Sequence, residues 1–392
     1  MSNSIFTARL ETIAQRGNLR TLPHIEHAGD MVRRPEGGHA MVNLSSNDYL
    51  ALASDHELRA RFESWLAQQQ REFPLSASSS RLLTGNFSIY DRLEARLAEL
   101  YGAEAALVFN SGYHANSGIL PAITTSSSLI LADKLVHASL IDGIRLSAAK
   151  CVRYAHNNYE QLEELLRERA HLHDMVVVVS ESIFSMDGDA ADLERLVALK
   201  ASYPNLLLYI DEAHAVGAMG ATGLGYAEEC GVMAQIDILV GTFGKALASV
   251  GAYAITSQEI KEWLVNTMRT LIFTTALPPL NLAWSLFVME NIASFAPRRA
   301  HLSSMANYLR SELGGESKVS CSHIIPIIVG ESSRAVALSA QLQEAGFYLL
   351  AVRPPTVPVG TSRLRLSLTS AVSEECAARL ITTIKRLTTS KL

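Results

Sequence analysis

The feature that most limits the fold is an alternation of short, almost continuous apolar runs with longer amphipathic segments. Apolar runs of about five residues are typical of strands that are buried on both faces of a parallel sheet. The segments between them, such as 90–101, 159–169 and 192–202, have the periodicity of amphipathic helices. This pattern predicts an α/β domain wound from βαβ units. The apolar runs cover residues 105–109, 129–132, 175–179, 206–210, 236–240 and 252–255.

The 392-residue chain is long enough for more than one domain. We predict an N-terminal arm and helix over residues 1–45. A large α/β domain follows over 46–283, with a mostly parallel sheet flanked by helices. The pattern changes after Pro278-Pro279, where long helical stretches and a few strand-like pieces follow. Residues 284–392 are therefore predicted to form a smaller α+β domain.

The composition argues against several classes of protein. Hydrophobic residues make up 48% and charged residues 19%, which favours a sizeable core over disorder. The net charge is −5 and no long run of Lys and Arg occurs, so nucleic acid is not an expected partner. The four cysteines lie far apart and the histidines lack ligand spacing, so we expect neither a metal site nor a disulfide framework. No stretch approaches roughly 18 apolar residues and the N-terminus lacks a signal-peptide core, so we expect a cytoplasmic protein without a membrane span.

Polar residues and glycines follow four of the apolar runs directly. Because ligands of open α/β sheets bind at the carboxyl ends of the strands, we expect these residues to gather at one edge of the sheet. The set is a stronger indication than any one member, since an isolated aspartate is as well explained by a capped turn. Its members are Ser111, Gly112 and Tyr113 after 105–109, Glu181 and Ser185 after 175–179, Asp211 and His214 after 206–210, and Thr242 and Lys245 after 236–240.

Lys245, Asp211 and His214 suit chemistry based on pyridoxal 5′-phosphate (PLP). PLP withdraws electrons from the Cα of an amino acid, and it does so only while its pyridine nitrogen is protonated. A carboxylate such as Asp211 facing that nitrogen favours the protonated form, and His214 can donate a hydrogen bond to the ring hydroxyl. Lys245 lies among small and apolar residues, where a solvated lysine is unusual. A desolvated lysine of this kind loses its proton readily and can form the Schiff base to PLP.

The phosphate and the ring of PLP require further partners. Backbone N–H groups at a helix N-terminus bind phosphate, and Ser111, Gly112 and Tyr113 are predicted to lead into a helix over 114–120. Thr242 can add a hydroxyl group. His137 is a candidate to stack on the ring, although a packed core histidine explains it equally well.

Two nucleotide-binding interpretations fail on residue type and position. The segment 241–245 departs from the phosphate-loop pattern, because Leu239 stands where glycine is needed and Ala246 replaces Ser or Thr. The glycines at 217, 220, 223 and 225 do not open a helix directly after a strand, as a dinucleotide fingerprint requires. A dinucleotide-dependent oxidoreductase is therefore disfavoured. A non-catalytic relative would be expected to have lost Lys245 or Asp211, and both are present.

A series of motifs resembles the α-oxoamine synthases, a group of fold-type I PLP-dependent transferases, from about residue 44 to residue 368. The matching stretches are LSSNDYL (44–50), SRLLTGN (80–86), FNSGYHAN (109–116), DKLVHAS (133–139), SESIFSMDGD (180–189), DEAHAVGAMGATGLG (211–225), GTFGKAL (241–247), FTTALPP (273–279) and RPPTVPVGTSRLRLSL (353–368).

The resemblance implies a role for each matching position. Lys245 would carry PLP and act as acid and base, with Asp211 at the pyridinium, His214 at the ring hydroxyl and His137 stacked on the ring. The other implied positions are Gly112, Tyr113 and Thr242 around the phosphate, with Thr274 reaching in from a neighbouring subunit; Glu181 near the ring substituents; Asn47, Ser185 and Arg365 at the amino-acid carboxylate; and Arg20 and Arg353 near the acyl chain or its far carboxylate.

Within the group, the chain resembles most the member that makes a biotin precursor. Phe243 in the lysine motif and Arg353 at the start of the C-terminal motif carry this likeness. It implies a homodimer with shared active sites that condenses L-alanine with a pimeloyl thioester, on coenzyme A or a carrier protein, and releases CO₂. Serines fill much of the segment 75–80, where the family often has glycines. A relative that uses glycine and acetyl-coenzyme A, or a longer acyl chain, therefore remains an alternative.

Overall fold

The computed structural model describes residues 2–35, 37–69, 72–314 and 320–389. The chain divides into two compact units. Unit 1 comprises Met1–Ser54, Met186–Asp189 and His301–Leu392, and unit 2 comprises Asp55–Ser185 and Ala190–Ala300. Unit 2 carries a seven-stranded sheet, and unit 1 carries a four-stranded and a three-stranded sheet. Within the described part of the chain, no helix has both the length and the apolar character needed to cross a membrane.

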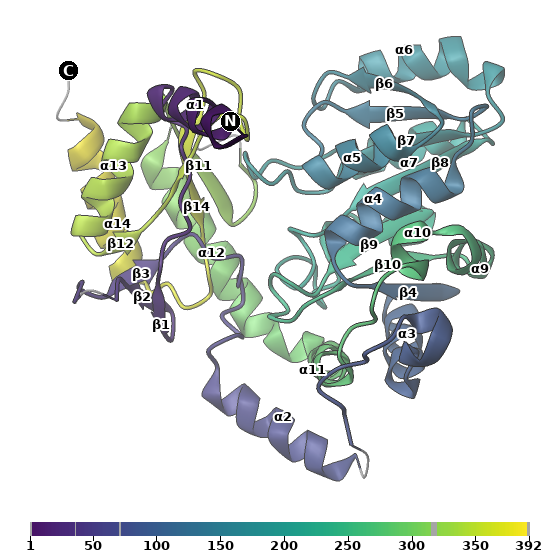
Figure 1. Ribbon diagram of the computed structural model, residues 1–392, viewed down its shortest axis with the longest axis horizontal. Coiled ribbons are helices and arrows are strands. Elements are labelled where there is room, and N and C mark those ends of the chain that lie inside the picture. Colours follow the sequence, from purple (N-terminus) through teal and green to yellow (C-terminus); the bar gives the residue numbers. More distant parts are fainter. Residues whose placement is uncertain (1, 36, 70–71, 315–319, 390–392) are drawn as a thin grey trace. The chain divides into compact units, whose positions relative to one another are not determined.

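The sheet of unit 2 is mostly parallel, as predicted (Figure 1). Its strand order is β4-β10-β9-β8-β7-β5-β6. The strands from β9 to β6 are parallel neighbours, and β10 is antiparallel to both β4 and β9. The strands are β4 (Ala105–Phe109), β5 (Leu129–Asp133), β6 (Lys150–Tyr154), β7 (Val176–Glu181), β8 (Leu206–Asp211), β9 (Ile238–Thr242) and β10 (Ala252–Thr256).

The central strands are buried along their whole length, which explains their continuous apolar runs. Every residue of β4, β5, β7, β9 and β10 is buried, so both faces of the sheet are covered. Residues of α4 and α5 pack on one face, together with alternate residues of the strands. The helical segments of unit 2 are α2 (His56–Gln68), η1 (Arg81–Gly85), α3 (Ser88–Tyr101), α4 (Gly112–Ile123), α5 (Ala138–Leu146), α6 (Tyr159–Arg169), η2 (Ala170–Leu172), α7 (Leu193–Ala201), α8 (Tyr226–Glu229), η3 (Met233–Gln235), α9 (Gln258–Thr267), α10 (Arg269–Ile272), α11 (Pro279–Glu290) and η4 (Ile292–Phe295).

Unit 1 is built from short, mostly antiparallel strands and from helices. β14 lies in the middle of the three-stranded sheet and is antiparallel to β11 and β13. The four-stranded sheet has the order β1-β2-β3-β12, with β3 and β12 parallel. The elements are α1 (Ser2–Gln15), β1 (Glu26–Ala28), β2 (Met31–Arg33), β3 (Met41–Asn43), β11 (Ile324–Gly330), α13 (Ser332–Glu344), β12 (Phe347–Tyr348), β13 (Ala351–Val352), β14 (Ser362–Ser367) and α14 (Glu374–Thr389), and α12 (Ala296–Leu313) begins in unit 2 and ends in unit 1.

Candidate active site

The carboxyl ends of the parallel strands meet at one edge of the large sheet. Glu181, the last residue of β7, lies opposite Asp211, the last residue of β8. β4 runs in the same direction as β9, because both are antiparallel to β10. Phe109 and Thr242, which end these two strands, lie opposite the same residue, Ala252. The topology thus brings the polar segments that follow β4, β7, β8 and β9 to one edge, as the sequence predicted.

Asp211 is held in a fixed orientation by donors to both of its carboxylate oxygens. Its Oδ1 accepts a hydrogen bond from the backbone N–H of Ala213 at 2.8 Å, and its Oδ2 accepts one from Asn116 Nδ2 at 2.6 Å. Asn116 is oriented in turn by the Tyr209 hydroxyl, which donates to its Oδ1 at 2.7 Å. Sequence reasoning gave Asn116 no role. The available signal was an asparagine inside a helix, where it is a poor helix former.

His137 is tied to the same network through Ser139. The His137 Nδ1 accepts from the backbone N–H of Ser139 at 3.2 Å and lies 2.7 Å from the Ser139 hydroxyl, which accepts from Asn116 Nδ2 at 2.9 Å. Because Nδ1 is an acceptor, the proton of the neutral ring lies on Nε2. Burial lowers the pKa of His137, and the nearby Asp211 carboxylate opposes this only in part. His137 is therefore a neutral, oriented imidazole.

Lys245 and His214 lie next to each other. The Lys245 Nζ is 2.9 Å from the His214 Nε2. The turn before the lysine is organised by the Thr242 hydroxyl, which donates to the Gly251 carbonyl and accepts from the backbone N–H of Gly244, both at 3.1 Å. The structure thus brings together Lys245, His214 and Thr242, which the sequence predicted at this edge of the sheet.

The N-terminus of α4 presents backbone donors after β4. Ser111 caps the helix, and its hydroxyl accepts from the backbone N–H of His114 at 3.2 Å. Gly112 and Tyr113 form the first turn, where backbone N–H groups have no acceptor within the helix. A phosphate group is the kind of anion that such a turn binds.

Three further predicted residues also belong to unit 2. Thr274 lies beside the start of this loop in the same chain, because its hydroxyl accepts from Asn110 Nδ2 at 3.3 Å. Ser185 is buried in the segment after β7. Burial, together with the neighbouring Asp211 carboxylate, raises the pKa of Glu181 well above its ordinary value, which favours the protonated carboxyl group.

Glu212, next to Asp211, closes the glycine-rich loop that follows β8. Its two carboxylate oxygens accept from the backbone N–H groups of Tyr226 and Ala227 at 2.9 and 2.7 Å. Gly225 has φ 120°, and a Cβ added there would come within 2.5 Å of the Glu212 carboxylate. Glycine is therefore required at this position. The two hydrogen bonds from Tyr226 and Ala227 therefore hold the end of this loop against Glu212, which directly follows Asp211.

We expect Glu212 to make stability depend on pH. Burial raises the pKa of its carboxyl group from 4.5 to about 7. The protonated carboxyl group therefore contributes roughly 3 kcal/mol to the free energy of unfolding. This contribution is fully present below the ordinary pKa and is lost as the pH rises through 7. Glu212→Gln has no such proton to lose. The free energies of unfolding of both proteins can be measured with denaturant between pH 5 and about pH 8. As the pH rises, we expect the wild type to lose stability relative to the variant. A pH-independent difference would contradict this assignment.

Arg365 and Asn47, predicted at the amino-acid carboxylate, lie together in unit 1. The Arg365 Nη1 donates to Asn47 Oδ1 at 3.2 Å. Arg363, two residues earlier on β14, is engaged elsewhere, because its guanidinium donates to the Asp187 carboxylate. Of these two arginines on β14, Arg365 is therefore the one that lies beside Asn47.

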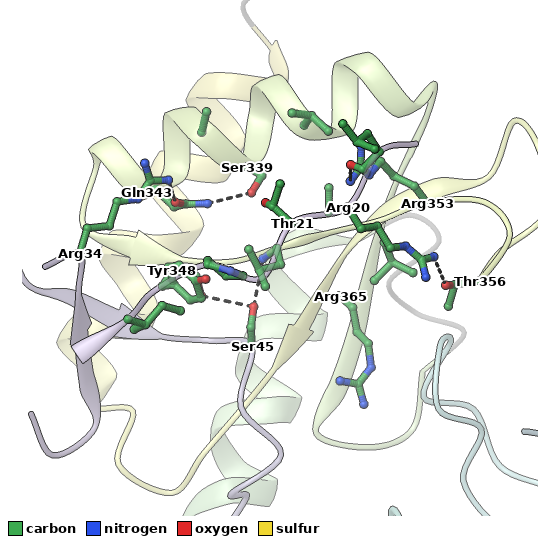
Figure 2. Close-up of a pocket in the computed structure, with 18 of the residues that line it drawn as sticks. Arg20, Thr21, Arg34, Ser45, Ser339, Gln343, Tyr348, Arg353, Thr356 and Arg365 are labelled. Carbon is green, nitrogen blue, oxygen red and sulfur yellow. Dashed lines mark hydrogen bonds between the residues drawn. The ribbon is translucent and has the colours of Figure 1, made fainter. Parts of the chain in front are cut away.

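Unit 1 contains a cavity of about 640 Å³ that Arg365 also lines. Figure 2 shows Arg20 and Arg353 on one side of it and Arg34 and Gln343 on the other. Polar side chains such as Thr21, Ser45 and Ser339 and several apolar side chains also line the cavity. The apolar side chains include Leu19, Ile25, Met186, Val336, Leu350 and Val352.

Arg20 and Arg353 hold the N-terminal arm against this cavity. The Arg20 Nη2 donates to the Thr356 hydroxyl at 2.8 Å (Figure 2). Arg353 donates to the backbone carbonyl of Gly17 and, at 3.4 Å, to that of Leu19. The structure thus brings both predicted arginines to one cavity, and it adds contacts to the chain's own backbone that sequence reasoning did not foresee.

Comparisons with known proteins agree on a single family. The class I and II aminotransferase family matches residues 39–384. A relative from Glaesserella parasuis, provisionally named 8-amino-7-oxononanoate synthase, is 52% identical over 96% of this chain and 98% of its own. A serine palmitoyltransferase from S. paucimobilis, solved with a PLP–myriocin adduct, has a TM-score of 0.87 and 26% identity, covering 98% and 97% of the two chains. An 8-amino-7-oxononanoate synthase from Francisella tularensis has a TM-score of 0.73 and 26% identity, covering 89% and 98%.

Proposed function

This chain belongs to the class I and II aminotransferase family and, within it, to the α-oxoamine synthases, and we propose that it condenses L-alanine with a pimeloyl thioester. The products are 8-amino-7-oxononanoate, the free thiol and CO₂. The chain is a PLP-dependent acyltransferase of fold type I. The observation that carries the choice of substrates is the arginine-lined cavity of unit 1, which supports an acyl chain with an anionic far end.

The residues at the sheet edge of unit 2 fit the cofactor. A pyridinium requires a fixed anion, and Asp211 is held by donors at both oxygens. A phosphate requires N–H donors, and the first turn of α4 provides them. In the proposal, Gly112, Tyr113 and Thr242 bind the phosphate and Lys245 carries the cofactor. Residues assigned to its ring are His137, His214 and Glu181.

The proposed chemistry assigns proton transfer to Lys245 and binding of the amino-acid carboxylate to Arg365, Asn47 and Ser185. Bound PLP supplies the electron sink for the amino-acid Cα. Lys245 Nζ takes the proton from Cα and later returns one, as a general base and acid. Arg365 pairs with the carboxylate through charge-assisted hydrogen bonds, with Asn47 and Ser185 as further donors. Cα then forms its bond to the acyl carbonyl carbon, the thiolate leaves, and the carboxylate departs as CO₂.

The cavity supports a medium-length acyl chain that ends in a negative charge. Its volume of about 640 Å³ lies within the ordinary range for small-molecule sites. The apolar side chains of the lining suit methylene groups, whereas Arg20 and Arg353 suit a carboxylate at the far end. An uncharged chain would leave these guanidinium groups without an anionic partner.

A homodimer is part of the proposal. Several large apolar side chains of unit 2 are exposed, among them Leu75 at 78%, Leu83 at 79% and Phe273 at 72%. Exposed apolar groups of this kind mark interaction surfaces. Phe273 directly precedes Thr274, which the family resemblance assigns to the phosphate of a neighbouring subunit.

The test is thiol release from pimeloyl-coenzyme A by the PLP-loaded protein, with and without L-alanine. We expect alanine-dependent release that exceeds release from heptanoyl-coenzyme A, which lacks the far carboxylate, by at least about tenfold. The same assay with a pimeloyl carrier protein identifies the preferred carrier. Release with glycine and acetyl-coenzyme A, or with serine and palmitoyl-coenzyme A, but not with the proposed pair, would replace the substrates while leaving the enzyme class unchanged.

A further inference from the structure

A buried tyrosine completes a three-membered cluster around the Arg365–Asn47 pair. The Tyr49 hydroxyl donates to Asn47 Oδ1 at 3.0 Å and accepts from Arg365 Nη2 at 3.4 Å. Arg365 Nη1 donates to the same Asn47 oxygen at 3.2 Å. The amide oxygen of Asn47 therefore receives two donors, which leaves its Nδ2 group as the donor end of the amide.

Tyr49 is itself firmly placed. Its side chain is fully buried, and its ring lies against that of His323, with centroids 4.0 Å apart. Its backbone carbonyl accepts from the N–H of Ser370 at 2.8 Å. Burial raises the pKa of the phenol, so the hydroxyl keeps its proton and remains a donor.

We propose that Tyr49 is a positioning residue that sets the amide of Asn47 and the guanidinium of Arg365 to receive an amino-acid carboxylate. With the Asn47 oxygen occupied by Tyr49 and Arg365, the amide presents N–H donors rather than an acceptor. A carboxylate needs donors only, and a rotated amide would turn its oxygen toward the incoming anion. This inference rests on the proposed function, because that function assigns the carboxylate to Arg365 and Asn47.

Tyr49→Phe tests this role, because it removes the hydroxyl and keeps the ring that packs on His323. We expect the dissociation constant of L-alanine, measured from the change in visible absorbance of the PLP-loaded protein, to rise about tenfold. The dissociation constant of ethylamine, which has the amine but no carboxylate, should stay unchanged. The rate at saturating alanine should change by less than about twofold, because the lost contact acts on binding.

A matched control is Tyr308→Phe, which removes the hydroxyl of an exposed tyrosine on α12 in the same unit. It should leave both dissociation constants as they are. Asn47→Asp should raise the dissociation constant of L-alanine more than Tyr49→Phe does, because a second carboxylate then faces the ligand and pairs with Arg365.

The outcomes separate this inference from the proposed function. If Tyr49→Phe raises the dissociation constants of L-alanine and ethylamine equally, or raises neither, the role of Tyr49 is overturned. If the wild-type protein releases no thiol with alanine and pimeloyl-coenzyme A, the proposed substrates fail. Glycine and L-serine then serve as the ligands, and selective weakening of these amino acids in Tyr49→Phe would still support the positioning role.

Discussion

Lys245→Ala is expected to lower alanine-dependent thiol release by about four orders of magnitude or more. The change removes both the amine that carries the cofactor and the group that moves the Cα proton, and a positioned base alone contributes about 10²- to 10⁴-fold. The visible absorbance band of PLP attached to the protein should also disappear. Both readouts come from the same purified protein, with steady-state release for the first and an absorbance spectrum for the second.

The matched control is Lys200→Ala in the same unit. Lys200 pairs with Asp237 at 2.7 Å, at the opposite end of the strands from Lys245. Its loss should leave the absorbance band and the rate close to those of the wild type. Retention of the band in Lys245→Ala would move the covalent attachment to another lysine and remove the basis of the site assignment.

Asp211→Asn is expected to reduce turnover by about a thousandfold while the protein stays folded. The substitution keeps the size of the side chain but removes the anion that favours a protonated pyridine nitrogen. Loss of one preorganised electrostatic partner costs about 10²- to 10³-fold in enzymes. The absorbance maximum of bound PLP should shift as well, because the charge on the ring changes. Thermal unfolding checks that the fold is retained.

Asp237→Asn provides the control for charge removal from unit 2. Asp237 precedes β9 at its amino end and accepts from the backbone N–H of Leu208 at 2.8 Å. Its replacement can affect stability, but it should leave the spectrum of bound PLP unchanged. An Asp211→Asn protein with wild-type turnover would show that another group stabilises the pyridinium.

The sequence predicted the buried strands and the amphipathic helices well, because burial on both faces imposes continuous apolar runs. The runs at 105–109 and 159–169 coincide with β4 and α6. The edge strand β6 was not predicted, because its exposed Lys150 and Arg153 interrupt any apolar pattern. β9 begins two residues later than expected, since Asp237 is engaged with Lys200 and the Leu208 backbone.

The candidate site was predictable as a set of residue types, whereas its supporting contacts were not. Strand ends identify Asp211 and Lys245 from position alone. The contact from Asn116 to Asp211 joins residues 95 positions apart, so no local pattern reports it. The different contacts of Arg363 and Arg365 also depend on the tertiary structure, because Arg363 donates to Asp187 and Arg365 donates to Asn47. The catalytic and binding roles themselves remain predictions until the variants are measured.

The contacts of Arg353 with the N-terminal arm have a thermodynamic consequence. The carbonyl groups of Gly17 and Leu19 each accept from a different Nη atom of this guanidinium, which has five N–H donors in all. An anion can therefore pair with Arg353 while the arm stays in place. The same contacts hold the arm that carries Arg20, so both guanidinium groups are positioned before a ligand arrives, and a preorganised site loses less conformational entropy on binding. Substitutions that loosen residues 17–19 would thus weaken the binding of an acyl ligand with a far carboxylate without touching it.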